Sequence, residues 1–287
     1  MTPGTIDTRR AAVFAGLSRG WIETRHMLTD TASMIGNFML PVIYVIVLLI
    51  MGDTRLPGTD FALGTMVLPS LVGMSIALGG LTGPAATIAI DREDGTLLRA
   101  KATPNGMLGY LLGKIVLFGS TAFFSVVLLV IPAVMVASEL ELGPRTWMKL
   151  TLLFVVGMLA TVPISVALGS LLKSSAQSAL LVLASVLLIV PSGNFYPITA
   201  LPTWLQWVGQ AFPFYWLGLG ARSAMLPEAM AAVEIAGSWR TLEMFVVLGL
   251  WTLIGMALAP RLLSRMARRQ SGASVAEARQ RVMSKGY

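Results

Sequence analysis

The chain contains several charge-free apolar runs that are each long enough to cross a lipid bilayer. A spanning helix needs about 20 mostly apolar residues, because about 30 Å of hydrocarbon is covered at 1.5 Å per residue. Such runs cover residues 33–51, 61–90, 115–138, 150–172 and 244–260. Since 55% of the residues are hydrophobic and only 12% are charged, an ordinary soluble domain is excluded. We therefore predict an all-α integral membrane protein.

The number of crossings depends on an uncharged stretch of 48 residues that follows Lys173. The stretch is too long for one crossing and long enough for two. If it crosses once and the N-terminus is cytoplasmic, 16 of the 21 Lys and Arg residues lie inside. The five outside are Arg55, Arg145, Lys149, Arg222 and Arg240. This split follows the positive-inside rule, whereas a second crossing would move the seven basic residues after Pro260 outside. We therefore predict six transmembrane helices within residues 33–260 and cytoplasmic N- and C-termini.

The regions on either side of this domain are expected at the cytoplasmic face. In residues 1–32, helical spacing separates apolar from polar side chains, as in an amphipathic helix that lies in the membrane interface. Its apolar face carries Phe14, Leu17, Trp21, Thr24 and Leu28, and its polar face carries Arg19, Glu23, His26 and Asp30. The first apolar run begins too late for a cleaved signal peptide. Residues 261–287 form a basic tail that we expect to lie against anionic lipid.

Residues 192–225 must then sit on or dip into the outer leaflet without crossing it. Gly193, Pro197, Pro202 and Pro213 interrupt any continuous helix, and eight aromatic residues fall within residues 195–216. Trp and Tyr favour the headgroup level, and broken backbone at membrane depth is tolerated only against protein or water. We predict a pair of short re-entrant or interfacial helices between spans five and six. Anchoring in the leaflet with no further role is the alternative.

The chain carries little of the chemistry that an enzyme or a gradient-driven carrier needs. It has no Cys and one His, so we expect no metal site and no catalytic residues. No ionisable side chain is evident at mid-membrane, and we interpret Lys114 as an anchor that reaches the interface. Gly113-Lys114 is not a phosphate-binding loop, because Ile115 follows it and Leu108 stands where that loop needs Gly. Energy for transport would have to come from another polypeptide.

The most polar segment expected on the cytoplasmic side is the loop 91–107 after the second span. It begins Asp91-Arg92-Glu93-Asp94-Gly95-Thr96-Leu97-Leu98-Arg99 and continues to Ala102-Thr103-Pro104. Acids at its front and bases at its back suit a short helix from about Thr96 to Ala102. Leu97 and Leu98, with flanking charges to fix the orientation, are suited to docking into a partner's groove. A merely solvated loop is the alternative.

Two segments resemble the membrane subunit, or permease, of type-2 ABC exporters. That family carries an acidic pair, Gly-Thr-Leu, a basic residue and Thr-Pro after its second span, as Glu93–Arg99 and Ala102–Pro104 do here. It also carries a small-residue turn, an aromatic-Pro, Leu-Pro-x-Trp-Leu and a later Pro before its last span. The matching residues are Ser192–Pro197, Leu201–Leu205 and Phe212-Pro213. The resemblance covers essentially the whole chain and is closest to the drug- and antibiotic-resistance branch.

The resemblance implies a coupling helix that is seated on a separate ATPase subunit, present in two copies. The residues implied in coupling are Asp91, Arg92, Glu93, Asp94, Gly95, Thr96, Leu97, Leu98, Arg99, Thr103 and Pro104. It also implies a second permease, identical or homologous, in the plasma membrane of a prokaryote. ATP and Mg would be bound by the ATPase, so this chain needs no cofactor of its own. Membrane lipids are the other expected partners. The net charge of +7 is assigned to membrane orientation and not to nucleic acid.

The substrate path is expected along the second and fifth spans, under an outer gate. The gate and path residues are Gly193, Asn194, Phe195, Tyr196, Pro197, Trp204 and Pro213. Apolar spans suit amphiphilic drugs, antibiotics or lipid-like molecules. A permease of the same family that exports polysaccharide or lipid is the alternative. A secondary carrier would rely on a thin set of polar residues, and a membrane enzyme on Asp91, Glu93 and Asp94, which no second group completes.

Overall fold

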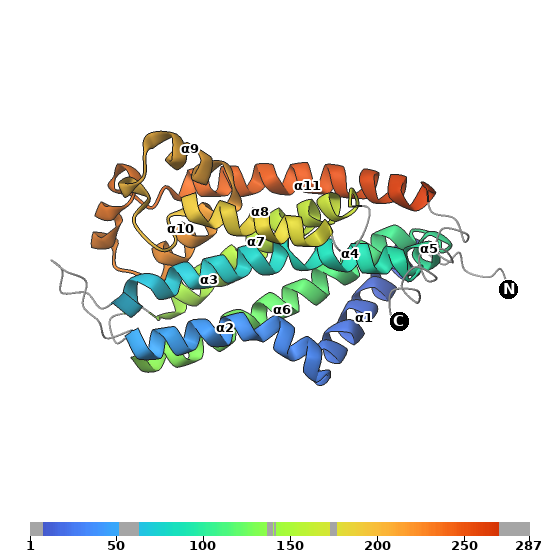
Figure 1. The fold of residues 1–287 in the computed structure, drawn as a ribbon, viewed down its shortest axis with the longest axis horizontal. Helices are drawn as coiled ribbons and strands as arrows, with labels where there is room; N and C mark the ends of the chain where they lie inside the picture. The colour runs from blue at the N-terminus through green and yellow to red at the C-terminus, as the bar shows by residue number, and fades with distance from the viewer. Residues whose placement is uncertain (1–7, 52–62, 137–139, 141, 173–176, 270–287) are drawn as a thin grey trace, which may run out of the picture.

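The computed structural model describes residues 8–51, 63–136, 140, 142–172 and 177–269. These residues form helices and turns, with no strand among them, and the long helices run side by side along one axis (Figure 1). The short helix α5 (Thr96–Lys101) marks one end of the bundle, here called the α5 end. The helices α9 (Thr203–Ala211) and α10 (Pro213–Met225) lie at the opposite end, here called the α9 end.

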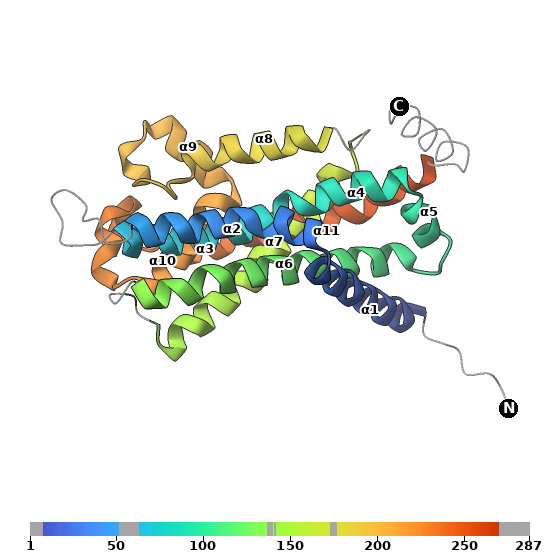
Figure 2. The same ribbon diagram turned by 60° about the horizontal axis from the view of Figure 1, so that its bottom comes forward.

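Seven further helices run along the bundle and one leans away from it. The seven are α2 (Thr31–Met51), α3 (Leu63–Leu81), α4 (Gly83–Glu93), α6 (Gly106–Val136), α7 (Pro144–Gly169), α8 (Ser178–Ile189) and α11 (Thr241–Arg269). Helix α1 (Thr8–Thr29) meets α2 at a steep angle (Figure 2). The angle forms at Asp30, whose carboxylate accepts a hydrogen bond from the Ser33 N–H at 2.8 Å and so caps α2. Short 3-10 turns cover Val190–Ser192, Ile198–Ala200, Glu228–Val233 and Ile235–Gly237.

Five stretches in the described part of the chain are long and apolar enough to cross a membrane. They are Thr31–Ile50, Val67–Arg92, Gly106–Ile131, Pro144–Gly169 and Thr241–Met266, and they correspond to the predicted spans one to four and six. The predicted fifth span falls on α8 and the following turn, Ser178–Ser192. At 1.5 Å per residue this segment covers about 22 Å, less than the hydrocarbon thickness. The residues just before it, 173–176, lie outside the described residues, so six crossings stay a prediction.

Several predicted boundaries change in the structure. The second span consists of two helices, α3 and α4, that are separated at Thr82. Residues 261–269 of the predicted tail continue α11 as a helix, and residues 270–287 lie outside the described part. The same holds for residues 1–7 of the N-terminal region and for residues 61, 62, 137 and 138 at span ends.

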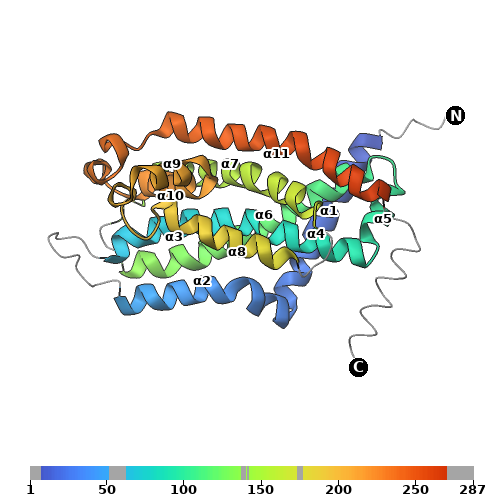
Figure 3. The same ribbon diagram turned by 45° about the horizontal axis from the view of Figure 1, so that its top comes forward.

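Helix α10 fills the middle of the bundle at the α9 end. Phe214, Tyr215 and Trp216 are at most 2% exposed, because α10 packs against α3, α7 and α11. These three rings therefore lie inside the protein, and their depth relative to the headgroups stays a prediction. Trp204 and Trp207 on α9 do face outward, with exposed fractions of 67% and 71%. Figure 3 shows α9 and α10 together at one end of the long helices.

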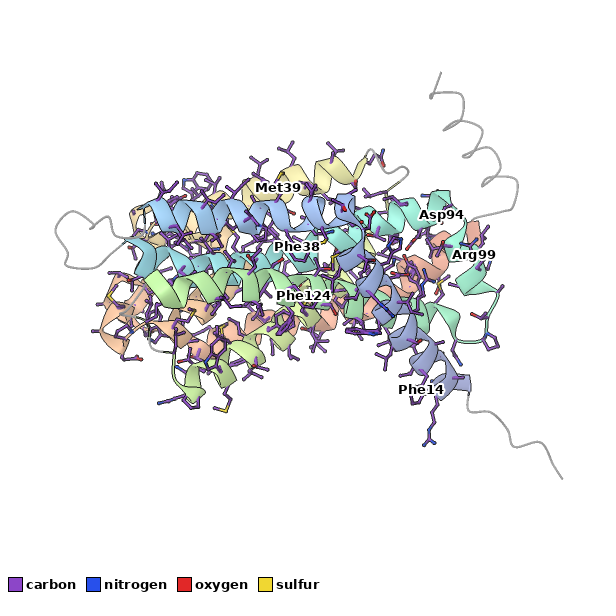
Figure 4. The ribbon with its side chains drawn as sticks, turned by 90° about the horizontal axis from the view of Figure 1, so that it is seen from below. Phe14, Phe38, Met39, Asp94, Arg99 and Phe124 are labelled. Atoms are coloured by element: carbon purple, nitrogen blue, oxygen red, sulfur yellow. The ribbon has the colours of Figure 1, made fainter. Side chains whose placement is uncertain are left out.

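Helix α1 is fixed on the bundle by small residues that sequence analysis did not single out. Gly16 and Gly20 of α1 face Gly109 and Gly113 of α6, and a Cβ at Gly16 would lie 2.4 Å from the Gly109 carbonyl oxygen. Such four-residue spacing of Gly lets two helices approach closely in membrane proteins. On the predicted apolar face, Phe14, Leu17 and Trp21 are exposed, and Phe14 points away from the bundle (Figure 4), whereas Thr24 is buried. On the predicted polar face, Glu23 turns inward to the Lys114 ammonium. The interfacial position of this helix stays a prediction.

We expect Gly16→Val to lower the free energy of unfolding by about 2 kcal/mol, because the added methyl groups would overlap the Gly109 backbone. Gly36→Val on α2 is the matched control, since a Cβ at Gly36 meets nothing within 4 Å. Thermal unfolding of both variants in detergent measures the difference. Equal melting temperatures would contradict the close packing of α1 on α6.

Candidate functional site

The turn between α4 and α5 is formed by one carboxylate and one glycine. The Asp94 carboxylate accepts a hydrogen bond from the Thr96 N–H at 3.0 Å. Gly95 has a φ of 79°, a left-handed conformation that residues with a Cβ rarely adopt. Helix α5 begins at Thr96, where the sequence predicts a short helix, and ends at Lys101. The turn therefore sends the chain sharply across the end of the bundle.

The return from α5 into α6 also depends on a glycine. A Cβ at Gly106 would lie 2.0 Å from the Ala100 carbonyl oxygen, so a side chain at this position does not fit. The Thr103 hydroxyl donates a hydrogen bond to the same carbonyl at 2.9 Å. Helix α6 starts at Gly106 and runs back along α4 into the bundle. The segment from Asp94 to Gly106 is therefore a compact projection and not a loose loop.

Part of the predicted coupling set lies on the outer surface of this projection. Asp94, Arg99, Thr103 and Pro104 are exposed, and Leu98 is half-buried. Figure 4 shows Asp94 and Arg99 together at the α5 end. The Arg99 guanidinium donates a hydrogen bond to the Thr96 hydroxyl at 2.8 Å, which holds it along α5. The outer surface of the projection therefore carries an acid, a base and one partly open leucine.

The rest of the predicted coupling set points inward, which corrects our expectation. Leu97 is 0% exposed and belongs to the buried apolar core, so it is not available as the docking contact that we expected. Gly95 and Thr96 are also buried. The Arg92 guanidinium donates a hydrogen bond to the Leu172 carbonyl at 2.7 Å, beyond the end of α7. The side chain of Glu93 lies outside the described residues.

Asp91 is also turned inward, and it belongs to a buried charged cluster behind α5. Its carboxylate lies 2.8 Å from the Lys114 ammonium and accepts a hydrogen bond from the Tyr110 hydroxyl at 2.7 Å. Lys114 also lies 3.1 Å from the Glu23 carboxylate of α1. Arg19 completes the cluster through a 2.7 Å contact with Glu23. The cluster therefore joins α1, α4 and α6 immediately behind the projection.

The side chains of this cluster are largely buried, which affects the position of Lys114 and the pKa of Glu23. The Lys114 side chain is 2% exposed, so our interpretation of it as an anchor that reaches the interface is wrong. Partial burial acts to raise the pKa of Glu23, but the Lys114 ammonium and the Arg19 guanidinium outweigh it and hold that pKa below its ordinary value of 4.5. Glu23 therefore stays ionised at neutral pH. An ammonium that faces two carboxylates in a mostly water-free space is held firmly in place.

A groove of about 430 Å³ opens beside the projection, between α1, α5 and the start of α6. Small residues make up much of its lining: Ala11, Ala12, Ala15, Gly16, Ala100, Gly106 and Gly109. Arg19, Arg99, Thr103, Pro104 and Tyr110 complete the lining. The small residues make the groove mostly apolar, and the two guanidinium groups add positive charge to its lining.

The predicted outer-gate residues do not converge on one site. Gly193 and Asn194 are buried, Tyr196 is half-buried, and Phe195, Pro197 and Trp204 are exposed. Pro213 is buried at the start of α10. Gly193 has a φ of 65°, and the Asn194 side chain donates a hydrogen bond to the Phe214 carbonyl at 3.1 Å. Gly193 and Asn194 therefore shape and fasten the turn, and Phe195 and Trp204 face outward.

Sequence analysis missed a second buried charged pair, at the α9 end. The Arg222 guanidinium lies 2.7 Å from the Glu234 carboxylate and also donates to the Ser70 hydroxyl at 2.8 Å. Its contact with the Asn194 side-chain oxygen, at 3.2 Å, links the pair to the outer turn. Arg222 is the single charged residue of residues 192–225, which is the signal that would have found it.

The Lys114 cluster and the Arg222–Glu234 pair hold neighbouring segments of the chain together. Neither has the composition of a metal centre. No group of three or more His, Cys, Asp or Glu side chains that could hold a metal ion occurs in the described residues. The Lys114 cluster sets two cations, Lys114 and Arg19, against two acids, Asp91 and Glu23, which balances its charge and leaves little capacity for a divalent ion. The exposed projection and its groove are therefore the candidate functional site, and the Lys114 cluster is its support.

We expect Lys114→Met to lower the free energy of unfolding by roughly 3 kcal/mol, because it leaves the Asp91 and Glu23 carboxylates without their shared cation. Arg19→Met is the matched control. The Arg19 side chain is 37% exposed, so its loss should cost less than about 1 kcal/mol. Thermal or denaturant unfolding in detergent measures both variants. Similar losses in the two variants would show that Lys114 does not hold the cluster together.

Comparison with known protein families gives this geometry its context. Residues 53–259 match the family described as ABC-2 family transporter protein, which covers more than half of the chain. The matched region includes the projection, the groove-facing part of α6 and the segment with α9 and α10. A comparison with curated proteins finds no match to this sequence. The chain belongs to the ABC-2 family of transporter proteins, as a multi-pass membrane subunit of an ABC transporter.

Proposed function

We propose that this chain is the permease half of an ATP-driven exporter and that the α5 projection docks onto a separate ATPase subunit. The observation that carries the proposal is the exposed edge of Asp94, Leu98, Arg99, Thr103 and Pro104 beside the groove between α1 and α5. A rigid projection next to an apolar groove with a cationic side suits a helix that has a small apolar face and an acidic side chain. Two copies of the ATPase would bind ATP and Mg and supply the energy.

The distribution of charge supports a cytoplasmic position for the α5 end. Exposed basic residues at that end include Arg9, Arg10, Arg25, Arg99, Lys101, Arg261 and Arg265. At the α9 end, the Arg222 guanidinium is buried against Glu234, so its charge is already balanced within the protein. By the positive-inside rule, both termini would then lie in the cytoplasm. The ATPase, which needs cytoplasmic ATP, would meet the permease at the same end.

The substrate class follows from the faces that the bundle leaves open. Helices α2 and α11 expose many apolar side chains, among them Ile35, Met39, Ile43, Val246 and Leu253. Lipid and a second permease, identical or homologous, would cover these faces. A path between such helices suits amphiphilic drugs, antibiotics or lipid-like molecules better than a sugar chain, which needs more hydrogen-bonding groups. Phe195 and Trp204 at the α9 end would then lie where the substrate leaves.

We expect Arg99→Glu to weaken binding of the ATPase subunit roughly tenfold, because it reverses an exposed charge beside the groove while α5 stays folded. The loss should be largest at low salt and should shrink as the salt concentration rises, because salt screens exposed charges. Arg145→Glu, which reverses an exposed charge at the start of α7 at the α9 end, is the control. Co-purification of the ATPase with each variant measures the effect. Equal recovery with both variants would remove the docking proposal.

The orientation is tested with single Cys probes, because the chain has no Cys of its own. A Cys at Ala102, in the exposed turn after α5, should be protected from an impermeant thiol reagent added to intact cells. A Cys at Gly143, in the exposed turn before α7, should be labelled. Opening the cells should make both accessible. The reverse labelling pattern would place the α5 end outside and contradict the proposed ATPase contact.

A further inference from the structure

Helix α3 and helix α4 are separated where one residue cannot donate a hydrogen bond. Pro84 follows the break at Thr82 and has no N–H, so the carbonyl of Gly80 loses the donor that a continuous helix would provide. One position further along, a continuous helix would join the Ala85 N–H to the Leu81 carbonyl. In the structure, the Ala85 N–H has a different partner.

The hydroxyl of Ser165, on α7, occupies the place of this helical hydrogen bond. The Ala85 N–H donates to Ser165 Oγ at 3.0 Å, and the Ser165 hydroxyl donates to the Leu81 carbonyl. On either side of the interruption the ladder is intact, since Thr82 N–H bonds to Leu78 at 3.0 Å and Ala86 N–H bonds to Thr82 at 3.3 Å. A single side chain from a neighbouring helix is therefore inserted between two backbone groups that would otherwise bond to each other. Insertions of this kind bend helices.

The packing around Ser165 explains how α7 comes so close to the break. Thr161, Ser165 and Gly169 lie four residues apart on one face of α7. A Cβ at Gly80 would lie 1.9 Å from the Thr161 hydroxyl oxygen, and a Cβ at Gly169 would lie 2.7 Å from the Ala85 Cα. Both glycines are needed for this approach. Ser165 itself is 0% exposed, so water does not compete for its hydroxyl.

We infer that Ser165 is a positioning residue that sets the bend of the second span and lets this span switch between two conformations during transport. If the hydroxyl withdraws, the Ala85 N–H can bond to the Leu81 carbonyl directly. Ser165 can then bond to a carbonyl of its own helix, as Thr161 does to Gly157 at 2.7 Å. Both conformations satisfy these groups, so the exchange leaves none of them without a hydrogen bond. A small force can therefore shift the balance between them.

The inference rests on the proposed function. In that function, the ATPase supplies the force that changes the bend, and the bend acts on the helices at the α9 end. Helix α4 leads directly into the α5 projection, where the ATPase would bind. Helix α3, beyond the break, packs against the buried helix α10 at the α9 end. A change in the bend at Leu81 and Ala85 would therefore move α10 when α5 is pushed. Ser165 would control how the two halves of the span are coupled.

The bend is measured directly with two spin labels on the second span. Cys residues placed at Val67 in α3 and Ile90 in α4 lie about 35 Å apart along the helix at 1.5 Å per residue, within the range of electron–electron distance measurement. We expect Ser165→Ala to shift the ratio of longer to shorter distances about tenfold towards longer distances, because one buried hydrogen-bonding group that holds the bend is lost.

Pro84→Ala should shift this distance ratio in the same direction, because it restores an N–H donor for the Gly80 carbonyl. Ser125→Ala should leave it unchanged, because the Ser125 hydroxyl donates a hydrogen bond within its own helix, to the Thr121 carbonyl at 3.0 Å.

The same variants are then assayed with the ATPase subunit present. Ser165→Ala and Pro84→Ala should keep ATP hydrolysis and melting temperature close to those of the parent protein, and the number of substrate molecules exported per ATP should fall several-fold. A merely structural Ser165 would change stability and leave this ratio intact. Unchanged distances in both variants would show that the Ser165 hydroxyl does not set the bend. Changed distances with an unchanged export ratio would show that the bend has no role in transport. If no ATPase binds the parent protein, the proposed function fails. The spin-label distances would still test whether Ser165 sets the bend.

Discussion

The Lys114 ammonium is the contact on which the arrangement of the α5 end depends. It lies between the carboxylates of Asp91 and Glu23, so it joins the helix that leads into α5, the helix that leads out of it and the N-terminal helix α1. Because the ammonium is almost fully buried, loss of either partner would leave a buried charge unpaired. The α5 projection is therefore held at a fixed angle to the bundle, although α5 itself is only six residues long.

Close backbone contact supplies the second constraint. Glycines bring α1 against α6 and α7 against the break between α3 and α4, and at both places a Cβ would overlap a neighbouring backbone or side-chain atom. In a bilayer, apolar side chains gain little by leaving lipid for protein, so helices associate through such close contacts and through hydrogen bonds. Ser165 shows both effects, because its hydroxyl reaches the α3 and α4 backbone only where α7 approaches closely. The bundle is thus tight at a few points and leaves apolar faces open on α2 and α11.

Sequence patterns predicted the candidate site's position better than the orientation of its residues. Gly95 and Pro104 mark the limits of the projection, because a left-handed turn and a missing N–H are properties of single residues. Which of Leu97 and Leu98 faces the core is not evident from two adjacent leucines in so short a helix. In the structure Leu97 is buried and Leu98 is partly open. Asp91 was expected to contact a partner, because a carboxylate in a polar loop gives no sign of a buried ammonium 23 residues later.

The sequence by itself determined that the chain is a helical membrane protein, where most of its long helices lie and where a short projection interrupts them. These properties depend on local composition: apolar length, charge asymmetry and the backbone limits of Gly and Pro. The tertiary structure alone decided that Lys114 is buried between two acids, that Arg222 pairs with Glu234 and that Ser165 enters the backbone of another helix. Each of these contacts joins residues on different structural elements. Which charge or hydroxyl finds which partner depends on how the helices pack, and helix periodicity within one segment carries no information about that.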